Sequence, residues 1–313
     1  MQLLNTRAAR LLEDIRTRAA ELRVTVHDEG LVSIIDFGVQ CDGGMNAGLL
    51  LARLCMSDLA EISITPDVLL FGNLPLVQVR TDHPVAACLM SQYAGWKIAT
   101  EDYFAMGSGP MRALAKNEEL FKDLPPTAEE NVAVGILESN KLPTPAAVEK
   151  IRASIGESRR LILAVAPTAS QAGNLQVVAR SVETTLHKLH ELHFPLSSIL
   201  SGSGTAPLPP IAKNDLHGIG RTNDAILYGG TVHLWVRCED EQIQSIGEQV
   251  PSCASASHGQ TFLSLFKAAN YDFYALDPAL FSPAIVIFHN LKSGRTFQYG
   301  RHLPELIKSS FEL

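Results

Sequence analysis

The passage from an apolar run into a helical pattern at residues 161–189 constrains the fold of this chain more than any other part of it. The run at 161–165 (LILAV) is typical of a buried strand, and the small and polar residues after it suit a turn or the start of a helix. Helical spacing comes next, with apolar side chains at Leu175, Val178, Ala179, Val182, Leu186 and Leu189. We therefore predict a strand, a turn and one amphipathic helix whose apolar stripe faces a core.

Polar and charged side chains share one flank of this predicted helix. At about 100° per residue, Gln176, Arg180, Glu183 and His187 fall beside one another next to the apolar stripe. On a surface helix the Arg180–Glu183 pair would contribute only about 0.2–0.5 kcal/mol. The same row can also line a cleft, and the spacing alone leaves a surface helix and a cleft wall both open.

Strands, glycine-containing turns and helices alternate along the chain, which indicates an α/β fold. The second half repeats the first in outline, and prolines between 125 and 145 mark a boundary. We predict two similar α/β lobes, 1–140 and 141–313, with the C-terminal segment able to pack back on the first. The expected elements are helices at 4–22, 46–56, 85–96, 111–120 and 261–269, and strands at 31–35, 62–65, 68–71, 76–80, 231–236 and 285–288. A short apolar piece at 132–137 lies between the prolines.

Composition and charge narrow the class of protein. Hydrophobic residues make up 46% and charged residues 19%, as in folded rather than disordered chains. A net charge of -7 without a basic run argues against a nucleic-acid-binding surface, and no apolar run reaches the ~18 residues of a membrane span. The cysteines have no CxxC spacing, so neither a disulfide framework nor a thiolate zinc site is indicated. We expect a cytoplasmic protein without nucleic-acid or membrane partners.

Two glycine-rich segments are candidate binding loops, because backbone amides in such turns can hold an anion or a polar ligand edge. They are Gly107–Pro110 (GSGP) and Ser201–Thr205 (SGSGT), and a tight turn explains each one equally well. A GxxxxGK[ST] motif and a strand-linked GxGxxG are absent from the sequence, so an ATPase or a nicotinamide dehydrogenase has no support. Since no GxSxG elbow occurs either, Ser108 and Ser203 suit hydrogen-bond donation rather than nucleophilic attack.

Histidines and aspartates are weaker candidates. His187, His190 and His193 could in principle supply metal ligands. Positive charge is favoured at a helix C-terminus, however, and Phe194-Pro195 ends the helix directly afterwards, so we predict no metal site. Aspartates at expected strand ends and loops can be functional or can cap turns and helices; they are Asp36, Asp82, Asp215 and Asp224.

Six groups of segments, in order along the chain, resemble blocks of the methenyltetrahydromethanopterin cyclohydrolase family, and together they cover nearly the whole sequence. Departures from the family pattern occur at Ser57-Asp58-Leu59-Ala60, where GGLA is expected, and at Gln171 and Asn174. They bear on substrate preference rather than on the class of reaction. The matching segments are ACLMSQYAGW (87–96), GSGPMRAL (107–114), APTAS (166–170) with RSVETTLHKL (180–189), GTAPLPP (204–210), GRTNDAILYGG (220–230) and LFSPA (280–284).

The resemblance implies reversible hydrolysis of the methenyl bridge of a reduced, folate-like pterin carrier, which gives the formyl derivative. It implies two similar α/β lobes enclosing a deep interdomain pocket, no metal or organic cofactor, and assembly as a homotrimer. The sequence leaves open whether the carrier is tetrahydromethanopterin, its dephosphorylated form or a folate. Moderate charge content and several cysteines favour a mesophilic bacterium that oxidises one-carbon compounds.

The family motif places its catalytic arginine and glutamate at Arg180 and Glu183. Glu183 would act as general base on water, a role that typically contributes about 10²–10⁴-fold. Arg180 would keep Glu183 ionised and oriented. The residues predicted to hold the pterin and its tail are Gln176, Thr168, Ser170, Gly107, Ser108, Gly109, Ser203, Gly204, Thr205, Asn223 and Asp224.

Two functions without catalysis remain as alternatives. A non-catalytic reduced-pterin binding protein could use the same pocket, and a scaffold subunit could keep the fold without activity. The arginine favours the enzyme, because a protein that only binds a cation gains nothing from a nearby positive charge. The presence of both Arg180 and Glu183 argues against an inactive scaffold.

Overall fold

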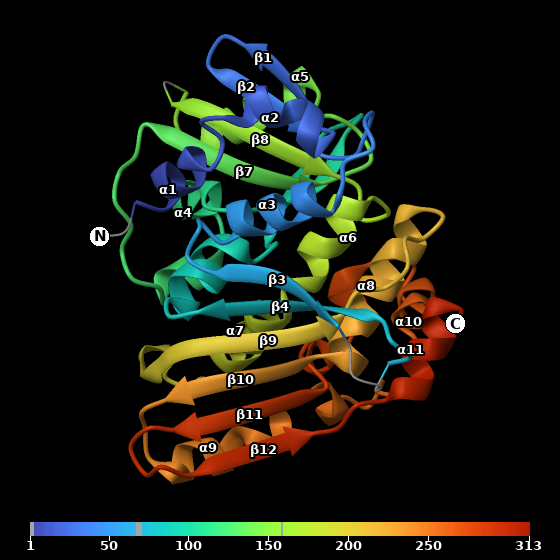
Figure 1. Ribbon diagram of the computed structural model, residues 1–313. Coiled ribbons are helices and arrows are strands. Elements are labelled where there is room, and N and C mark those ends of the chain that lie inside the picture. Colours follow the sequence, from blue (N-terminus) through green and yellow to red (C-terminus); the bar gives the residue numbers. More distant parts are fainter. Residues whose placement is uncertain (1–2, 67–70, 158) are drawn as a thin grey trace. The chain divides into compact units, whose positions relative to one another are not determined.

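The computed structural model describes residues 3–66, 71–157 and 159–313 (Figure 1). Spatial contacts group the chain into two units, each with its own six-stranded mixed sheet. Unit 1 comprises Met1–Ala60 and Ala86–Gln176, and unit 2 comprises Glu61–Val85 and Val177–Leu313. The predicted fold class, two α/β lobes, is confirmed. The predicted boundary between the lobes at residue 140 stays a prediction.

The sheet of unit 1 has three parallel strands at its centre, in the order β1-β2-β8-β7-β6-β5 (Figure 1). Every residue of the run 161–165 is buried, because a parallel strand is covered on both faces and therefore has a continuous apolar sequence. The strands are β1 (Thr25–Glu29), β2 (Val32–Asp36), β5 (Trp96–Ala99), β6 (Phe104–Ser108), β7 (Val132–Glu138) and β8 (Arg160–Ala166).

The helices of unit 1 agree only partly with the predicted ranges. The single helix predicted over 4–22 is wrong, since α1 (Leu4–Arg10) packs on β7 whereas α2 (Ile15–Leu22) packs on β1. The helix predicted over 85–96 ends at Gln92, because Trp96 begins β5. The remaining helices are α3 (Met45–Cys55), a π-helix (Val85–Gln92), α4 (Met111–Ala115), a 3₁₀ turn (Glu119–Lys122), α5 (Pro145–Ile155) and α6 (Gln171–Val178).

The sheet of unit 2 runs in the order β12-β11-β10-β9-β4-β3, with one parallel pair, β10 and β11. The glycine loop predicted at 201–205 is wrong, because these residues form the middle of strand β9. The strand predicted at 68–71 lies mostly outside the described residues. The strands are β3 (Glu61–Pro66), β4 (Pro75–Thr81), β9 (Ile199–Pro207), β10 (Thr231–Val236), β11 (Ile285–Asn290) and β12 (Thr296–Gly300).

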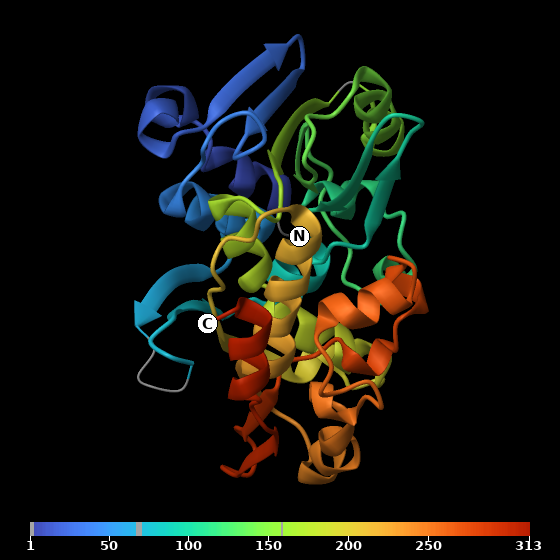
Figure 2. The same ribbon diagram turned by 90° about the vertical axis from the view of Figure 1, so that its right-hand side faces the viewer.

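Helix α7 (Ser181–Glu191) packs on β9 and β10 of this sheet, while α10 and α11 pack on α8 beside it (Figures 1 and 2). Within the described residues no helix combines the length and the apolar character needed to span a bilayer. The other helical elements are α8 (Asp215–Gly229), α9 (Asp240–Ile246), α10 (Phe262–Ala268) and α11 (Pro304–Phe311), with 3₁₀ turns at Leu196–Ser198, Gly247–Gln249, Ser252–Ala254, Phe273–Ala275 and Pro278–Leu280.

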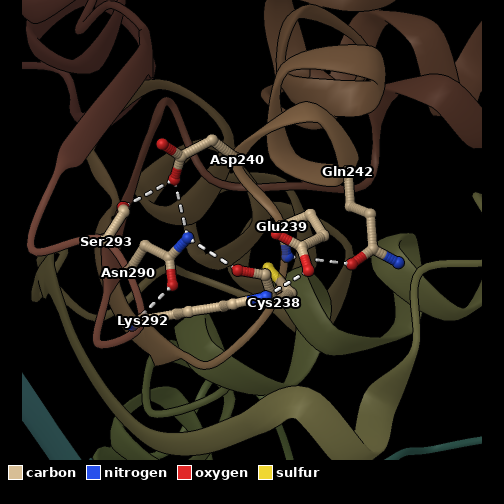
Figure 3. A network of polar contacts seen from close by, with 7 residues as sticks. All are labelled: Cys238, Glu239, Asp240, Gln242, Asn290, Lys292 and Ser293. Atoms are coloured by element: carbon tan, nitrogen blue, oxygen red, sulfur yellow. Dashed lines mark hydrogen bonds and ion pairs between the residues drawn. The ribbon is translucent and has the colours of Figure 1, made fainter.

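A polar network joins the carboxyl end of β11 to the start of α9 (Figure 3). Asn290 donates to Asp240 Oδ1 over 2.7 Å, and Ser293 Oγ donates to the same oxygen over 2.7 Å. The Ser293 bond is the main reason that the pKa of Asp240 lies below its ordinary value. Glu239 and Gln242 form a capping box at the first turn of the helix. These groups hold α9 against the β11–β12 turn, so the network has a structural explanation.

Candidate functional site

The stretch at 161–189 folds as predicted up to its helix, which is interrupted. Helix α6 ends at Val178, residues 179–180 form a turn, and α7 begins at Ser181. Arg180 is the N-cap residue of α7, with φ -87° and ψ 7°. The prediction of one continuous helix is therefore wrong, and Gln176 does not share a helical flank with Glu183.

Arg180 and Glu183 both lie at the start of α7 and are almost fully buried. The exposed fraction is 6% for Arg180 and 3% for Glu183. Charged side chains are rarely buried to this degree, because removal from water is costly. Glu183 lies in the first turn, where the helix dipole stabilises negative charge by about 0.3–1 kcal/mol. The fold thus keeps an arginine and a glutamate largely out of contact with water at one helix end.

The glycines of β9 allow α7 to pack closely on the sheet. A Cβ at Gly204 would lie 2.4 Å from Ser181 Oγ, and one at Gly202 would lie 2.9 Å from Val182 Cγ1. A Cβ contact below 3.0 Å forces a neighbouring atom to shift, so glycine at both positions lets the first turn of α7 approach this closely without displacement. These glycines therefore determine the position of the turn that carries Glu183.

Ser203 and Thr205 project from the opposite face of β9, because successive side chains of a strand alternate. Ser203 pairs with Arg80 of β4 and with His233 of β10, and it is partly exposed. Within unit 2 the structure therefore brings Gly204 to the start of α7 but leaves Ser203 and Thr205 on the other face of the sheet.

Gln176, on α6, belongs to a hydrogen-bonded chain within unit 1. Its Nε2 donates to Glu138 Oε1 over 2.9 Å, and its Oε1 accepts from Cys55 Sγ over 3.4 Å. Ser108 Oγ lies 3.7 Å from the same sulfur. Gln176, Cys55 and Ser108 are fully buried, whereas Glu138 is partly exposed. Two predicted site residues, Gln176 and Ser108, are thus linked through a cysteine to a carboxylate at the end of β7.

The sequence analysis missed Glu138. Its position directly after the short apolar piece 132–137 was the available indication, because that piece can form a buried strand and functional groups gather where parallel strands end. Asp36 ends the neighbouring parallel strand β2, and its carboxylate accepts from the backbone N–H groups of Gly38, Val39 and Gln40 over 2.6–2.8 Å. Asp36 therefore shapes its own loop.

Thr168 and Ser170 lie in the turn between β8 and α6 and are largely buried. Ser170 Oγ donates to Pro167 O over 2.8 Å and accepts from Gly173 N over 3.0 Å, so it fastens the start of α6. These contacts show how the turn is held, and the predicted ligand contacts of both residues stay predictions.

Gly107 and Gly109 flank Ser108 at the end of β6, in tightly packed positions. A Cβ at Gly107 would lie 2.8 Å from Ile98 Cδ1, and one at Gly109 would lie 2.6 Å from Ile136 Cδ1. Gly109 also has a φ of +86°, which side-chain-bearing residues rarely adopt. Close packing is thus one reason for glycine at both positions.

Asn223 and Asp224 lie on α8, where both make contacts within unit 2. Asn223 Nδ2 donates to Ile219 O of its own helix over 2.8 Å. Asp224 is fully buried and accepts from Phe262 N (2.8 Å) and from Ser310 Oγ (2.5 Å). Burial raises the pKa of the Asp224 carboxyl to about 7. Asp224 therefore ties α8 to α10 and α11, and its predicted role in ligand binding stays a prediction.

The histidines at the end of α7 lie apart from any metal-binding cluster in the part of the chain that the structure describes. His187 Nδ1 lies 3.9 Å from Glu191 Oε1 in the last turns of the helix. Among the described residues, His, Cys, Asp and Glu do not come together in groups of three or more that could hold a metal ion.

Comparison with known proteins gives matches along nearly the entire chain. A family model described as Cyclohydrolase (MCH) matches residues 3–311. A Rhodopirellula baltica protein named methenyltetrahydromethanopterin cyclohydrolase is 48% identical over 288 residues, 90% of this chain and 86% of the relative. Proteins of the same name from Methylobacillus flagellatus and Methanosarcina mazei are 43% and 41% identical, over 89% and 96% of this chain and 86% and 92% of their own lengths.

Proposed function

Because this chain belongs to the MCH family of methenyltetrahydromethanopterin cyclohydrolases, we propose that it hydrolyses 5,10-methenyl-tetrahydromethanopterin reversibly to the 5-formyl derivative, with Glu183 as general base. The chain is a hydrolase by its membership of this family. What carries the assignment of the base is the burial of Glu183 and Arg180 together at the start of α7.

The chemistry of the substrate explains why a carboxylate is needed. The methenyl carbon lies between two nitrogens that share a positive charge, so it is already electrophilic. A nucleophile is lacking, because water at neutral pH attacks slowly. Glu183 takes a proton from water as the water oxygen attacks the carbon. The C–N10 bond of this adduct then breaks and N10 receives a proton, while the hydroxyl of the adduct loses its own proton to the solvent. The formyl group stays on N5, and one proton is released for each cation hydrolysed. Water and protein side chains are sufficient for these steps.

Arg180 is proposed to orient Glu183 and to balance its charge in a position with little water. An oriented base matters because the attacking atom must stand about 3–3.5 Å from the carbon. Arg180 can also donate hydrogen bonds to the oxygen that becomes the formyl group. In a protein that only binds a cationic pterin, the arginine would weaken the binding, so its presence favours the enzyme over the non-catalytic binding protein.

The near-ultraviolet absorbance of the methenyl derivative tests this function directly. Wild type should make the band decay, whereas Glu183→Gln should slow turnover about 10²–10⁴-fold with little change in affinity. Glu191→Gln is the matched control, because Glu191 lies in the last turn of the same helix with 43% of its side chain exposed. Equal decay with wild type and Glu183→Gln would show that Glu183 is not the base. Binding without decay by wild type would support the non-catalytic alternative.

We propose also that the protein assembles as the homotrimer that the family resemblance implies. Its role would be cytoplasmic one-carbon oxidation. Size-exclusion chromatography with light scattering measures the assembly. A mass of three chains supports the trimer, and any other mass contradicts it.

A further inference from the structure

We infer that Glu138 binds the edge of the pterin ring that presents two N–H donors, the ring N–H and the exocyclic amino group. We infer also that Gln176 holds Glu138 in position. The inference rests on the proposed function, because that function supplies a pterin as the ligand. It names a binding residue and a positioning residue within unit 1.

The place of Glu138 in the fold suits a ligand contact. It is the last residue of β7, at the carboxyl edge of the parallel strands β2, β8 and β7. Ligands of open α/β sheets bind outside this edge. Asp36 ends β2 at the same edge, but its two oxygens serve three backbone N–H groups of its own loop. Glu138 differs because a side chain from another element, α6, fixes it.

Three buried side chains determine where the Glu138 carboxylate stands. The Gln176 amide is oriented by Cys55, which donates to its oxygen over 3.4 Å, so that its nitrogen faces Glu138 at 2.9 Å. Ser108 lies beside the cysteine sulfur at 3.7 Å. Buried polar groups are costly unless they are hydrogen-bonded. This chain of polar groups leads outward from the core to a partly exposed carboxylate, which is the arrangement of a preorganised binding group.

The acceptor pattern of a carboxylate complements a pterin. The 2-amino-4-oxo ring of a pterin presents two adjacent N–H donors, and an ionised carboxylate can accept both through its two oxygens. Each oxygen has two lone pairs, so Glu138 Oε1 can accept from Gln176 and from the ligand together. The negative charge also favours the cationic methenyl form over neutral relatives.

A substrate analogue tests the inference without any change to the protein. The 2-deamino counterpart of methenyl-tetrahydromethanopterin lacks one of the two donors. With wild type, its KM should be about 10- to 150-fold higher, while kcat changes only a few-fold. With Glu138→Gln, KM for the normal substrate should rise by a similar factor, and the two substrates should no longer be distinguished. Equal KM values with wild type, or continued discrimination by Glu138→Gln, would overturn the assignment.

Variants of Gln176 separate positioning from general structural support. Gln176→Leu should raise KM in the wild-type background but have no further effect on KM in the Glu138→Gln background, because both changes disable one interaction. Additive effects would contradict the positioning role. Glu129→Gln is the control, since Glu129 lies in unit 1 with 84% of its side chain exposed, and its KM should equal that of wild type.

The outcome for Glu138 can be told apart from the outcome for the proposed function. If wild type leaves the methenyl absorbance unchanged, the cyclohydrolase proposal fails while the binding proposal remains open to measurement. Calorimetric titration of wild type and Glu138→Gln with tetrahydropterin and 2-deamino-tetrahydropterin then decides it. Discrimination by wild type alone supports Glu138, and no discrimination by either protein overturns it.

Discussion

The backbone of Gly204 in β9 lies against the side chain of Ser181 at the first turn of α7, so closely that a Cβ on the glycine would stand 2.4 Å from Ser181 Oγ. The strand and the helix can approach this closely because Gly204 has no side chain. Because Arg180 and Glu183 flank Ser181 at that turn, their positions depend on a glycine about twenty residues further along the chain.

Gly204→Ala should lower kcat strongly and lower the free energy of unfolding moderately. The new methyl group must displace the first turn of α7, and a shift of about 1 Å at a catalytic group can reduce the rate about 10²-fold. Overpacking of this kind destabilises by about 1–3 kcal/mol. Activity assays and urea unfolding measure the two effects. Adding Ser181→Ala removes the closest atom and should restore part of the lost kcat; no restoration would mean that the clash lies elsewhere.

Arg112→Met should strongly destabilise unit 1. The Arg112 side chain is fully buried, pairs with Glu118, and donates to Leu89 O (3.0 Å) and Ser91 O (3.2 Å). Removing one partner of a buried ion pair typically costs about 3–5 kcal/mol, because the other charge is left without compensation. Urea unfolding measures the change in free energy.

A matched exposed ion pair provides the control for Arg112. Arg80 pairs with Glu61, and these side chains are 66% and 73% exposed. Arg80→Met should change the free energy of unfolding very little, since exposed pairs contribute little. Similar losses for Arg112→Met and Arg80→Met would contradict the importance assigned to burial.

Asp224 should make folding less favourable as pH rises from about 4 to about 7. Burial raises the pKa of its carboxyl to about 7 in the folded protein, while the unfolded chain has the ordinary value near 3.9. In this window the folded state keeps a proton that the unfolded state has lost, so the stabilisation present at low pH disappears as pH rises through 7. At about 1.4 kcal/mol per pKa unit, the loss is on the order of 4 kcal/mol.

Asp224→Asn isolates this effect, because an amide can accept from Phe262 N and donate to Ser310 Oγ without titrating. The variant should be more stable than wild type by an amount that grows from pH 4 to pH 7 and is constant above it. Urea unfolding without ligand, at pH 5, 6, 7 and 8, measures this difference. Parallel pH profiles for the two proteins would contradict the raised pKa.

Much of the local structure follows from residue pattern alone. The continuous apolar run 161–165 predicts a strand buried on both faces, and β8 has this property. Helical spacing likewise predicts α3 and α10 at nearly their observed bounds. These predictions succeed because periodicity and burial depend on neighbouring residues.

The sequence by itself determined the family, the α/β class and the candidate pair Arg180 and Glu183. Tertiary structure decided that the helix through these residues is broken at Arg180, that Gly204 lies in a strand rather than a loop, and that Gln176 contacts Glu138. Helical spacing continues through 175–189 whether or not the helix does, because the apolar residues on both sides of the break are buried. A contact such as that of Gly204 with Ser181 depends on segments distant in the chain, which local pattern does not report.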